Sequence, residues 1–392
     1  MINWHEMRIL ILVVAAGPFA YYLVASVAAL RFFGGRRGLR RDYAPPVSIL
    51  KPVRGLDREA YENYASFCRL DYPEYEILFN VADERDAAIP LIERLIREFP
   101  QRSIRLFLGA EQLGSSNKVN KLSNMVSEAR YDLLVMSDSD IRVRPDYLWA
   151  VVTPFRDSRV GAVTCLYRGL VGRSFGSIIE ALGNTSDFAA GVLVAWLFRS
   201  VNFALGATMA TTKQRMAEIG GFEDLADHFT DDHELGHRIA GLGYRVEIAT
   251  QPVDTVYPET SMREYFRHQL RWSLAIRHAA PAGYLGRIFV HAIFWMLVGI
   301  AAAPSLAIAA GYLAAYLILR PLMAWTVGVW GLRDPLLRTN IWRLPVHDAC
   351  AFFVYVSSFF TRRVEWRGTV YNIRGKELIP VVSDAARVSA RG

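Results

Sequence analysis

The first long apolar stretch of the sequence covers residues 9–30, which contain no charged side chain. A bilayer-spanning helix needs about 20 consecutive apolar residues, so this stretch is long enough to cross a membrane. No small-residue cleavage site stands out, which favours an uncleaved anchor over a signal peptide. Several arginines follow the stretch at once, namely Arg31, Arg36, Arg37, Arg40 and Arg41. Because basic residues flank spans on the cytoplasmic side, we expect residues 1–40 to be an N-terminal anchor that places the next domain in the cytoplasm.

A second apolar region lies in residues 288–332 and is interrupted by two prolines. Its length gives room for two spanning helices in a hairpin. Residues 344–361 are a weaker candidate because His347 and Asp348 lie among them. A further crossing there would move later arginines away from the cytoplasm, so we expect a re-entrant or interfacial segment. We therefore interpret residues 287–392 as a C-terminal transmembrane region with a cytoplasmic tail.

Between these two regions, short apolar runs alternate with amphipathic stretches. The runs expected to be strands are residues 45–52, 75–81, 104–108, 133–136, 160–166, 202–212 and 244–248. Apolar residues at helical spacing lie between them, most clearly in residues 90–99. Strands that alternate with helices predict a parallel sheet covered by helices. We therefore expect residues 41–255 to form an α/β domain.

Acidic residues follow two of the expected strands. Asp83 comes after residues 75–81, and Asp138 and Asp140 come after residues 133–136. Because parallel strands end at one edge of the sheet, where α/β folds bind ligands, we expect these carboxylates to lie near each other. Two carboxylates one residue apart suit Mg²⁺ or Mn²⁺, whose other positions can take phosphate oxygens. An acidic turn without a metal is the plainer interpretation of the pair taken alone.

Two further segments have the composition of helices at a membrane surface. Residues 174–198 are largely apolar but contain Glu180 and Asp187, so we expect a helix in the core or at the interface. Residues 256–286 contain an amphipathic stretch with the sequence HQLRW near its middle. We interpret this second segment as interfacial.

The composition adds limits to this picture. The chain of 392 residues is 52% hydrophobic and has a net charge of +7. Because the arginine cluster adjoins a membrane segment, contact with anionic lipid headgroups explains the positive charge, and we expect no nucleic-acid partner. The three cysteines show no metal-ligand spacing and are typical of a reducing compartment.

Several short motifs occur in a fixed order along the chain. They are KPVRGLD (51–57), Val81-Ala82-Asp83, NKVNKL (117–122), SDSDI (137–141), Asp231-Asp232 and HQLRW (268–272). Together they resemble the glycosyltransferases of family 2, and most closely the ceramide glucosyltransferase group, family 21. The resemblance covers the chain from about Pro46 to Trp272 and extends to the membrane layout. It implies an α/β fold of the GT-A (Rossmann-like) type with α-helical transmembrane segments.

The resemblance implies a nucleotide-sugar site built from the earlier motifs. Asp83 would contact the uracil or ribose of a UDP-sugar. Asp138 and Asp140 would bind Mg²⁺ or Mn²⁺ on the diphosphate, where a metal neutralises developing charge. Lys118 would approach the phosphates, although a lysine exposed on a solvated helix is an equally good interpretation.

The later motifs would supply the base and the closing groups. Asp232 would remove the proton of the acceptor hydroxyl, and one base without a covalent nucleophile implies inversion at the anomeric carbon. Arg271 and Trp272 would close over the diphosphate and the sugar. Trp272 as an interfacial anchor and Asp231 as a helix cap are the structural alternatives. His268 would belong to the same donor site. It stands where the family usually has Gln or Arg, so a fixed charge is missing there, but a neutral histidine can still donate one hydrogen bond.

These motifs beside membrane anchors predict a multi-pass enzyme of a bacterial inner membrane. It would move one sugar, N-acetylglucosamine or glucose, from a UDP donor to a hydroxyl of a hopanoid- or ceramide-type lipid. A processive polysaccharide synthase is the alternative, but its channel would need more spanning helices. A zinc metalloprotease is a remote alternative, because His233 and His237 flank Glu234 in an H-E-x-x-H pattern.

Overall fold

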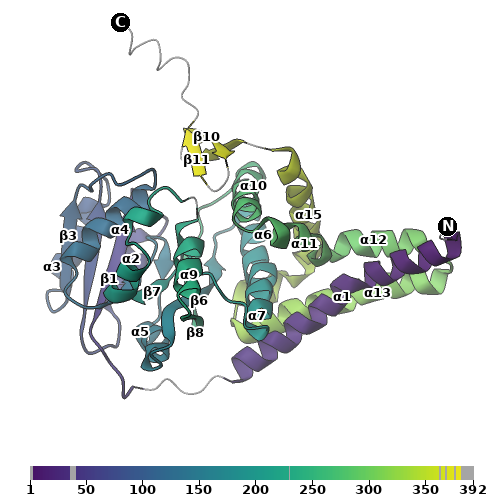
Figure 1. Cartoon of the computed structure of the whole chain (residues 1–392), viewed down its shortest axis with the longest axis horizontal. Coiled ribbons are helices and arrows are strands. Elements are labelled where there is room, and N and C mark those ends of the chain that lie inside the picture. The colour runs from purple at the N-terminus through teal and green to yellow at the C-terminus, as the bar shows by residue number, and fades with distance from the viewer. Residues whose placement is uncertain are drawn as a thin grey trace, which may run out of the picture.

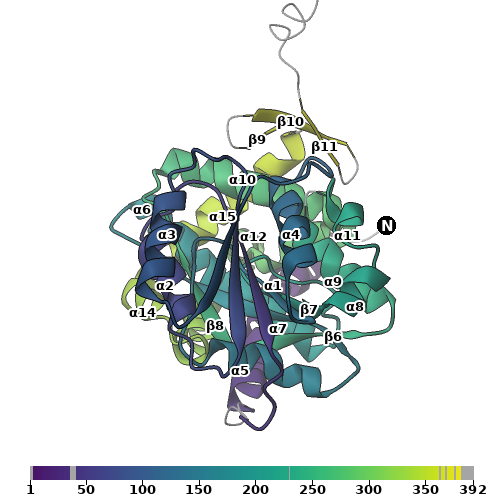
Figure 2. The same cartoon turned by 90° about the vertical axis from the view of Figure 1, so that its left-hand side faces the viewer.

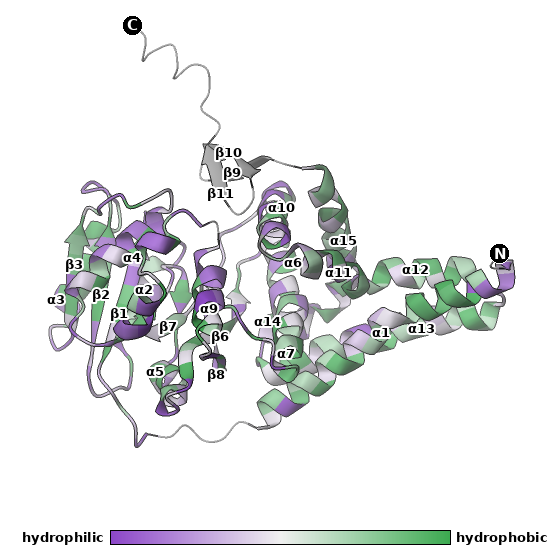
Figure 3. Cartoon of the chain, viewed as in Figure 1, coloured by the Kyte–Doolittle hydropathy of each residue, from purple (hydrophilic) through white to green (hydrophobic). Residues whose placement is uncertain are grey.

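The structure is a computed structural model that describes residues 3–35, 41–228, 230–361, 363–366, 369–374 and 377–380. An α/β unit lies at one end of the molecule and a group of long apolar helices at the other (Figure 1). Figure 3 shows that hydrophobic residues dominate these long helices, whereas the α/β unit is mixed. The expected combination of an α/β domain with apolar helices is therefore confirmed.

An eight-stranded sheet forms the centre of the α/β unit (Figure 2). The strands are β1 (Val47–Val53), β2 (Tyr75–Val81), β3 (Ser103–Leu108), β4 (Leu133–Met136), β5 (Ile141–Arg142), β6 (Val160–Leu170), β7 (Met209–Thr212) and β8 (Arg245–Val256). Their order across the sheet is β3-β2-β1-β4-β7-β6-β8-β5. The run of four apolar residues predicted to be the central strand is β4, and all four side chains are buried.

The expected parallel sheet is correct for one half of the sheet only. Strands β3, β2, β1 and β4 are parallel, but β7 is antiparallel to both β4 and β6. The long connection after β6 enters β7 from the opposite end of the sheet, and the alternation of strand and helix in the sequence does not reveal this reversal. The sheet is therefore mixed.

Helices cover both faces of the sheet (Figure 2). They are α2 (Ala60–Cys68), α3 (Ile89–Glu98), α4 (Asn117–Glu128), α5 (Tyr147–Val152), α8 (Lys213–Glu218) and α9 (Asp231–Gly241). Successive strand residues point to opposite faces, so Ile49 packs with the core under α2, α3 and α5, and Leu50 with the core under α4, α8 and α9. Strand β1 thus contributes apolar side chains to the cores on both faces of the sheet.

Three helical segments in the described part of the chain are long and apolar enough to cross a membrane: Trp4–Gly34, Phe175–Leu197 and Leu306–Gly331. The first is α1, which contains the predicted anchor. The second contains α6 (Phe175–Gly183), a π-helical turn and α7 (Ala189–Leu197), and 56% of its apolar window is buried inside the protein. That burial agrees with the expectation of a core helix.

The predicted hairpin consists of α12 (Ala292–Ala302) and α13 (Leu306–Ala324). Helix α12 has 11 residues and is about 16 Å long, shorter than a hydrocarbon core of about 30 Å. It reaches the length of a span only together with the preceding segment Pro281–Val290, which is bent by 56° relative to it. That segment contains α11 (Pro281–Gly286).

The remaining elements all follow β8 in the sequence. They are α10 (Met262–Ala279), α14 (Pro335–Asn340), α15 (Leu344–Phe360) and the antiparallel strands β9 (Arg363–Trp366), β10 (Thr369–Arg374) and β11 (Glu377–Pro380). Helices α6, α10 and α15 lie between the α/β unit and the long apolar helices (Figure 1). The domain boundaries after residues 40, 255 and 286, and the interfacial or re-entrant character of residues 344–361, stay predictions.

Candidate active site

A buried lysine fixes the backbone of the S-D-S-D motif at the end of β4. The Lys51 ammonium on β1 donates to the carbonyl oxygen of Asp138 at 2.6 Å and lies 3.9 Å from the centre of the Phe67 ring. Burial lowers the pKa of Lys51 to about 7, although Asp140 and Asp138 act in the opposite direction. This hydrogen bond therefore holds the S-D-S-D motif against the neighbouring strand β1.

Asp57 lies next to the two carboxylates of this motif and completes a group of three. The Ser139 hydroxyl donates to Asp57 Oδ2 at 2.5 Å, which brings the end of the KPVRGLD segment next to Asp138 and Asp140. Burial, followed by the charges of Asp138 and Asp57, raises the pKa of Asp140 to about 7. Such a concentration of oxygen ligands and negative charge suits a hard divalent cation.

Lys118 lies in the first turn of α4, where the Ser116 hydroxyl caps the helix. Its ammonium is 2.7 Å from Asp138 Oδ1 and 3.8 Å from Asp231 Oδ2. Burial acts to lower the pKa of Lys118, but the carboxylates of Asp138, Asp231 and Asp232 outweigh it and raise that pKa. The interpretation as a lysine on a solvated helix is therefore wrong. Asp231 is the first residue of α9 and not its cap.

The Asp232 carboxylate, on α9, lies near Lys118 and Asp138. Its Oδ2 accepts from the Gly206 amide at 2.9 Å and its Oδ1 from the His233 amide at 2.8 Å. A Cβ atom added to Gly206 would lie 3.2 Å from Asp232 Oδ2, 3.5 Å from Asp138 Oδ2 and 3.5 Å from Lys118 Nζ. Burial and the charge of Asp231 raise the pKa of Asp232 to about 6. The two motifs predicted to carry catalysis thus meet across Gly206.

The H-E-x-x-H pattern has another explanation. A Cβ atom at Gly236 would overlap the backbone nitrogen of Ala204, so glycine lets α9 approach the loop that carries Gly206. The Glu234 carboxylate accepts from Arg238 Nε at 3.0 Å, which is the partner one helical turn away. Neither histidine belongs to a group of three or more metal-ligand side chains in the described residues. This pattern therefore serves the packing of α9.

The histidine of the HQLRW motif is directed at α6. Trp272 Nε1 donates to His268 Nε2 at 2.9 Å, and an indole nitrogen can only donate. His268 Nδ1 therefore has the hydrogen and donates to Glu180. Arg271 is partly buried on the same helix, and Trp272 is 40% exposed. The closing of Arg271 and Trp272 over the donor stays a prediction.

Asp83 stands at the end of β2, on the same edge of the sheet as Asp138. It is exposed, and its Oδ1 accepts from the Arg85 amide at 2.9 Å. Strand β1 separates β2 from β4, so the two carboxylate-bearing strands are about 10 Å apart. A contact from Asp83 to a nucleotide stays a prediction.

The sequence analysis did not identify four residues that belong to this region. Lys51 and Asp57 are the two ends of the KPVRGLD motif, so that motif contained the signal for them. Gly206 and Glu180 have no local signal, because their role depends on contacts with Asp232 and His268.

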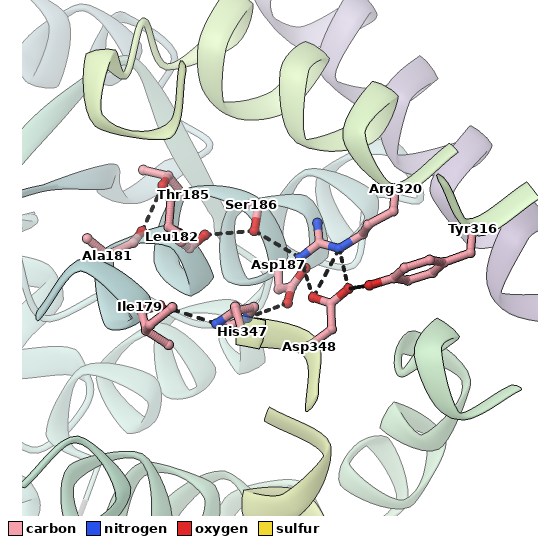
Figure 4. Close-up of polar contacts among 10 residues, drawn as sticks. All are labelled: Ile179, Ala181, Leu182, Thr185, Ser186, Asp187, Tyr316, Arg320, His347 and Asp348. Carbon is pink, nitrogen blue, oxygen red and sulfur yellow. Dashed lines mark hydrogen bonds and ion pairs between the residues drawn. The ribbon is translucent and has the colours of Figure 1, made fainter. Parts of the chain in front are cut away.

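A second polar cluster lies among the apolar helices (Figure 4). Arg320, which is 1% exposed, pairs with Asp187 at 2.8 Å and binds both oxygens of Asp348. His347 Nε2 lies 2.8 Å from Asp187 Oδ2, and the Tyr316 hydroxyl donates to Asp348 at 2.7 Å. Ligand atoms of the two aspartates and the histidine lie within 4.8 Å of one another, as a metal site would require. The guanidinium already supplies the cation there, so we assign the cluster to ion pairing.

Comparison with known proteins agrees with this geometry. Ceramide glucosyltransferase 3 of Caenorhabditis elegans is 25% identical over 378 residues, which is 86% of this chain and 74% of the relative. Ceramide glucosyltransferase 1 of the same organism is 27% identical over 229 residues, which is 58% of this chain and 49% of that relative.

The fold also matches a solved structure. A mannosyltransferase from Pyrobaculum calidifontis, solved with GDP-mannose and Mn²⁺, superposes with a TM-score of 0.52 at 19% identity and covers 90% of this chain and 99% of its own. This likeness supports the GT-A fold of the catalytic unit. The sequence profile of glycosyl transferase family 21 matches residues 10–379. The chain therefore belongs to glycosyl transferase family 21.

Proposed function

We propose that this glycosyltransferase moves one sugar, N-acetylglucosamine or glucose, from a UDP-sugar to a hydroxyl of a ceramide- or hopanoid-type membrane lipid, with inversion. The observation that carries the proposal is the meeting of Asp232, Asp138 and Lys118 across Gly206. The ceramide glucosyltransferase relatives and the apolar helices beside the site favour a lipid acceptor.

The donor side of the proposed site is formed by carboxylates and cationic side chains. Asp138 and Asp140 would bind Mg²⁺ or Mn²⁺, and the crowding of Asp57 against them fits a cation in that place. When bound, the metal would neutralise charge on the leaving diphosphate. Lys118 and Arg271 would add positive charge for the phosphates, and Asp83 would contact the nucleoside.

The acceptor step needs a base on the opposite side of the sugar. We assign this role to Asp232, whose pKa of about 6 leaves it ionised at neutral pH yet basic enough to take a proton. As the acceptor oxygen bonds to the anomeric carbon, its proton passes to the Asp232 carboxylate and the bond to the UDP oxygen breaks. The Gly206 and His233 amides keep the carboxylate in place during this step.

Lipid mass spectrometry tests the proposal. Membranes that contain the full chain are supplied with UDP-glucose or UDP-N-acetylglucosamine, and the lipids are compared with those from Asp232→Asn. Asp132→Asn is the matched control, because Asp132 is exposed. A lipid heavier by one hexose or N-acetylhexosamine with the wild type and the control, but not with Asp232→Asn, supports the proposal. The absence of any glycosylated lipid with both donors refutes it.

A further inference from the structure

A cavity of about 310 Å³ lies where the α/β unit meets the helices on the membrane side. Its lining includes Glu180, Tyr257, Glu259, Glu264 and His268. These residues come from α6, from the segment after β8 and from α10, and Figure 1 shows α6 and α10 between the sheet and the long apolar helices. The cavity is large enough for a small polar group.

Two of the three carboxylates in this lining are already engaged by the protein. Glu259 pairs with Arg58 at 3.3 Å and accepts from the Ser174 amide at 2.7 Å. Glu264 accepts from the Ser261 amide at 2.8 Å, as the third residue of a capping box. These contacts fix the rim of the cavity, and Glu180 is the remaining carboxylate of the lining.

Glu180 is 3% exposed, and its position is determined by two neighbours on α10. His268 Nδ1 and Gln269 Nε2 both donate to Oε1 of Glu180. Glu180 also lines the cavity, so its carboxylate is placed to accept a hydrogen bond from a ligand that can donate, such as a hydroxyl group.

The cavity adjoins the reaction centre through β8. The Val256 amide donates to the carbonyl oxygen of Asp140 at 2.9 Å, and Tyr257 is the next residue. Burial raises the pKa of Tyr257 well above its ordinary value, and the charges of Glu180 and Asp140 both act in the same direction. The Tyr257 phenol therefore lies within electrostatic range of both carboxylates.

Aromatic and basic side chains, which are typical of a membrane interface, lie at the start of α6. A Cβ atom at Gly176 would contact the carbonyl oxygen of Thr260 in the cavity wall, so the start of α6 adjoins the cavity. The preceding Phe175 is exposed, and Arg343 lies 5.5 Å from its ring and 4.8 Å from the ring of Trp342. A lipid that enters beside Phe175 can keep its tails among apolar groups.

We infer that this cavity binds the polar headgroup of the lipid acceptor, with Glu180 accepting a hydrogen bond from a headgroup hydroxyl. The inference rests on the proposed function and adds the subsite that selects the acceptor. The three carboxylates of the lining disfavour an anionic headgroup by like-charge repulsion. The site therefore takes neutral hydroxylated lipids and rejects their phosphate esters.

A binding experiment without any sugar donor tests the subsite. The full chain in phosphatidylcholine nanodiscs is titrated with radiolabelled hexanoyl-ceramide and monododecylglycerol, and the 1-phosphate of each is used as competitor. We expect saturable binding of a neutral lipid, weak competition by the phosphates, and affinity about tenfold or more lower in Glu180→Gln, which loses a charged acceptor. Equal affinity of Glu180→Gln and wild type, or no saturable binding of either neutral lipid, overturns the inference.

Two controls separate the subsite from a general effect on folding. Glu111→Gln removes an exposed carboxylate and should bind as the wild type does. Gln269→Ala removes one donor to Glu180 but leaves the charge of Glu180 in place, so the preference for the neutral lipid over its phosphate should persist. Glu180→Gln removes that charge and should reduce this preference. A preference that is unchanged in Glu180→Gln contradicts the inference even if that variant is less stable.

Transfer kinetics then distinguish the two proposals. With a donor present, Glu180→Gln should raise the KM for the lipid and leave the KM for the donor unchanged. Binding that depends on Glu180 without any sugar transfer by the wild type would retain the subsite and refute the proposed function. Transfer by the wild type with an unchanged lipid KM in Glu180→Gln would retain the proposed function and refute the subsite.

Discussion

Replacement of Arg320 by methionine should strongly destabilise the arrangement of the helices. The guanidinium is buried between Asp187 on the π-helical turn and Asp348 on α15, and it makes ion pairs of 2.8 Å with both. Methionine fills much of the same volume but leaves the buried Asp348 and the partly buried Asp187 without the guanidinium. Removal of one partner from a buried ion pair costs about 3–5 kcal/mol.

Thermal unfolding of the purified protein in detergent measures this loss. Arg338→Met is the matched control, because Arg338 is exposed on α14 and its loss should cost at most about 0.5 kcal/mol. Adding Asp348→Asn to Arg320→Met should recover part of the stability, since one uncompensated charge disappears. An Arg320→Met protein that unfolds within about 1 kcal/mol of the wild type would refute the reasoning, because that is less than the cost of breaking a buried pair.

Three further predictions concern Asp140, Lys118 and Gly236. Because the pKa of Asp140 is about 7, protons compete with a metal for this carboxylate. The affinity for Mn²⁺, measured by calorimetry, should therefore fall by up to about tenfold for each pH unit below 7. A constant affinity between about pH 5.5 and 7.5 would contradict this prediction. Lys118→Met should lower kcat by about 10²–10³-fold through lost charge stabilisation, and a change of less than about threefold would exclude that role. Gly236→Ala should destabilise the protein by about 1–3 kcal/mol through overlap with the loop at Ala204. Gly241→Ala, where an added Cβ has no neighbour within 4 Å, should be neutral or stabilising in the same melting assay.

The sequence by itself determined the local elements of this protein. The uncharged run in residues 9–30 lies within α1, and the four apolar residues before the S-D-S-D motif are β4. Such elements are predictable because the length and period of an apolar run depend only on neighbouring residues. The resemblance carried by the ordered motifs also predicted that Asp138 and Asp232 belong to one site, and both carboxylates lie near Gly206 in the folded chain.

Only the tertiary structure decided how distant segments meet. The reversal of β7, the capture of His268 by Glu180, and the ion pairs of Arg320 with Asp187 and Asp348 join residues from separate helices and strands. Each of these contacts depends on the packing of elements far apart in the sequence, and a lone buried charge has no preferred partner until that packing exists. For this reason the motif of His268 predicts a donor-site residue, which stays a prediction, while its contact with α6 and its place in the cavity lining are known only from the folded chain.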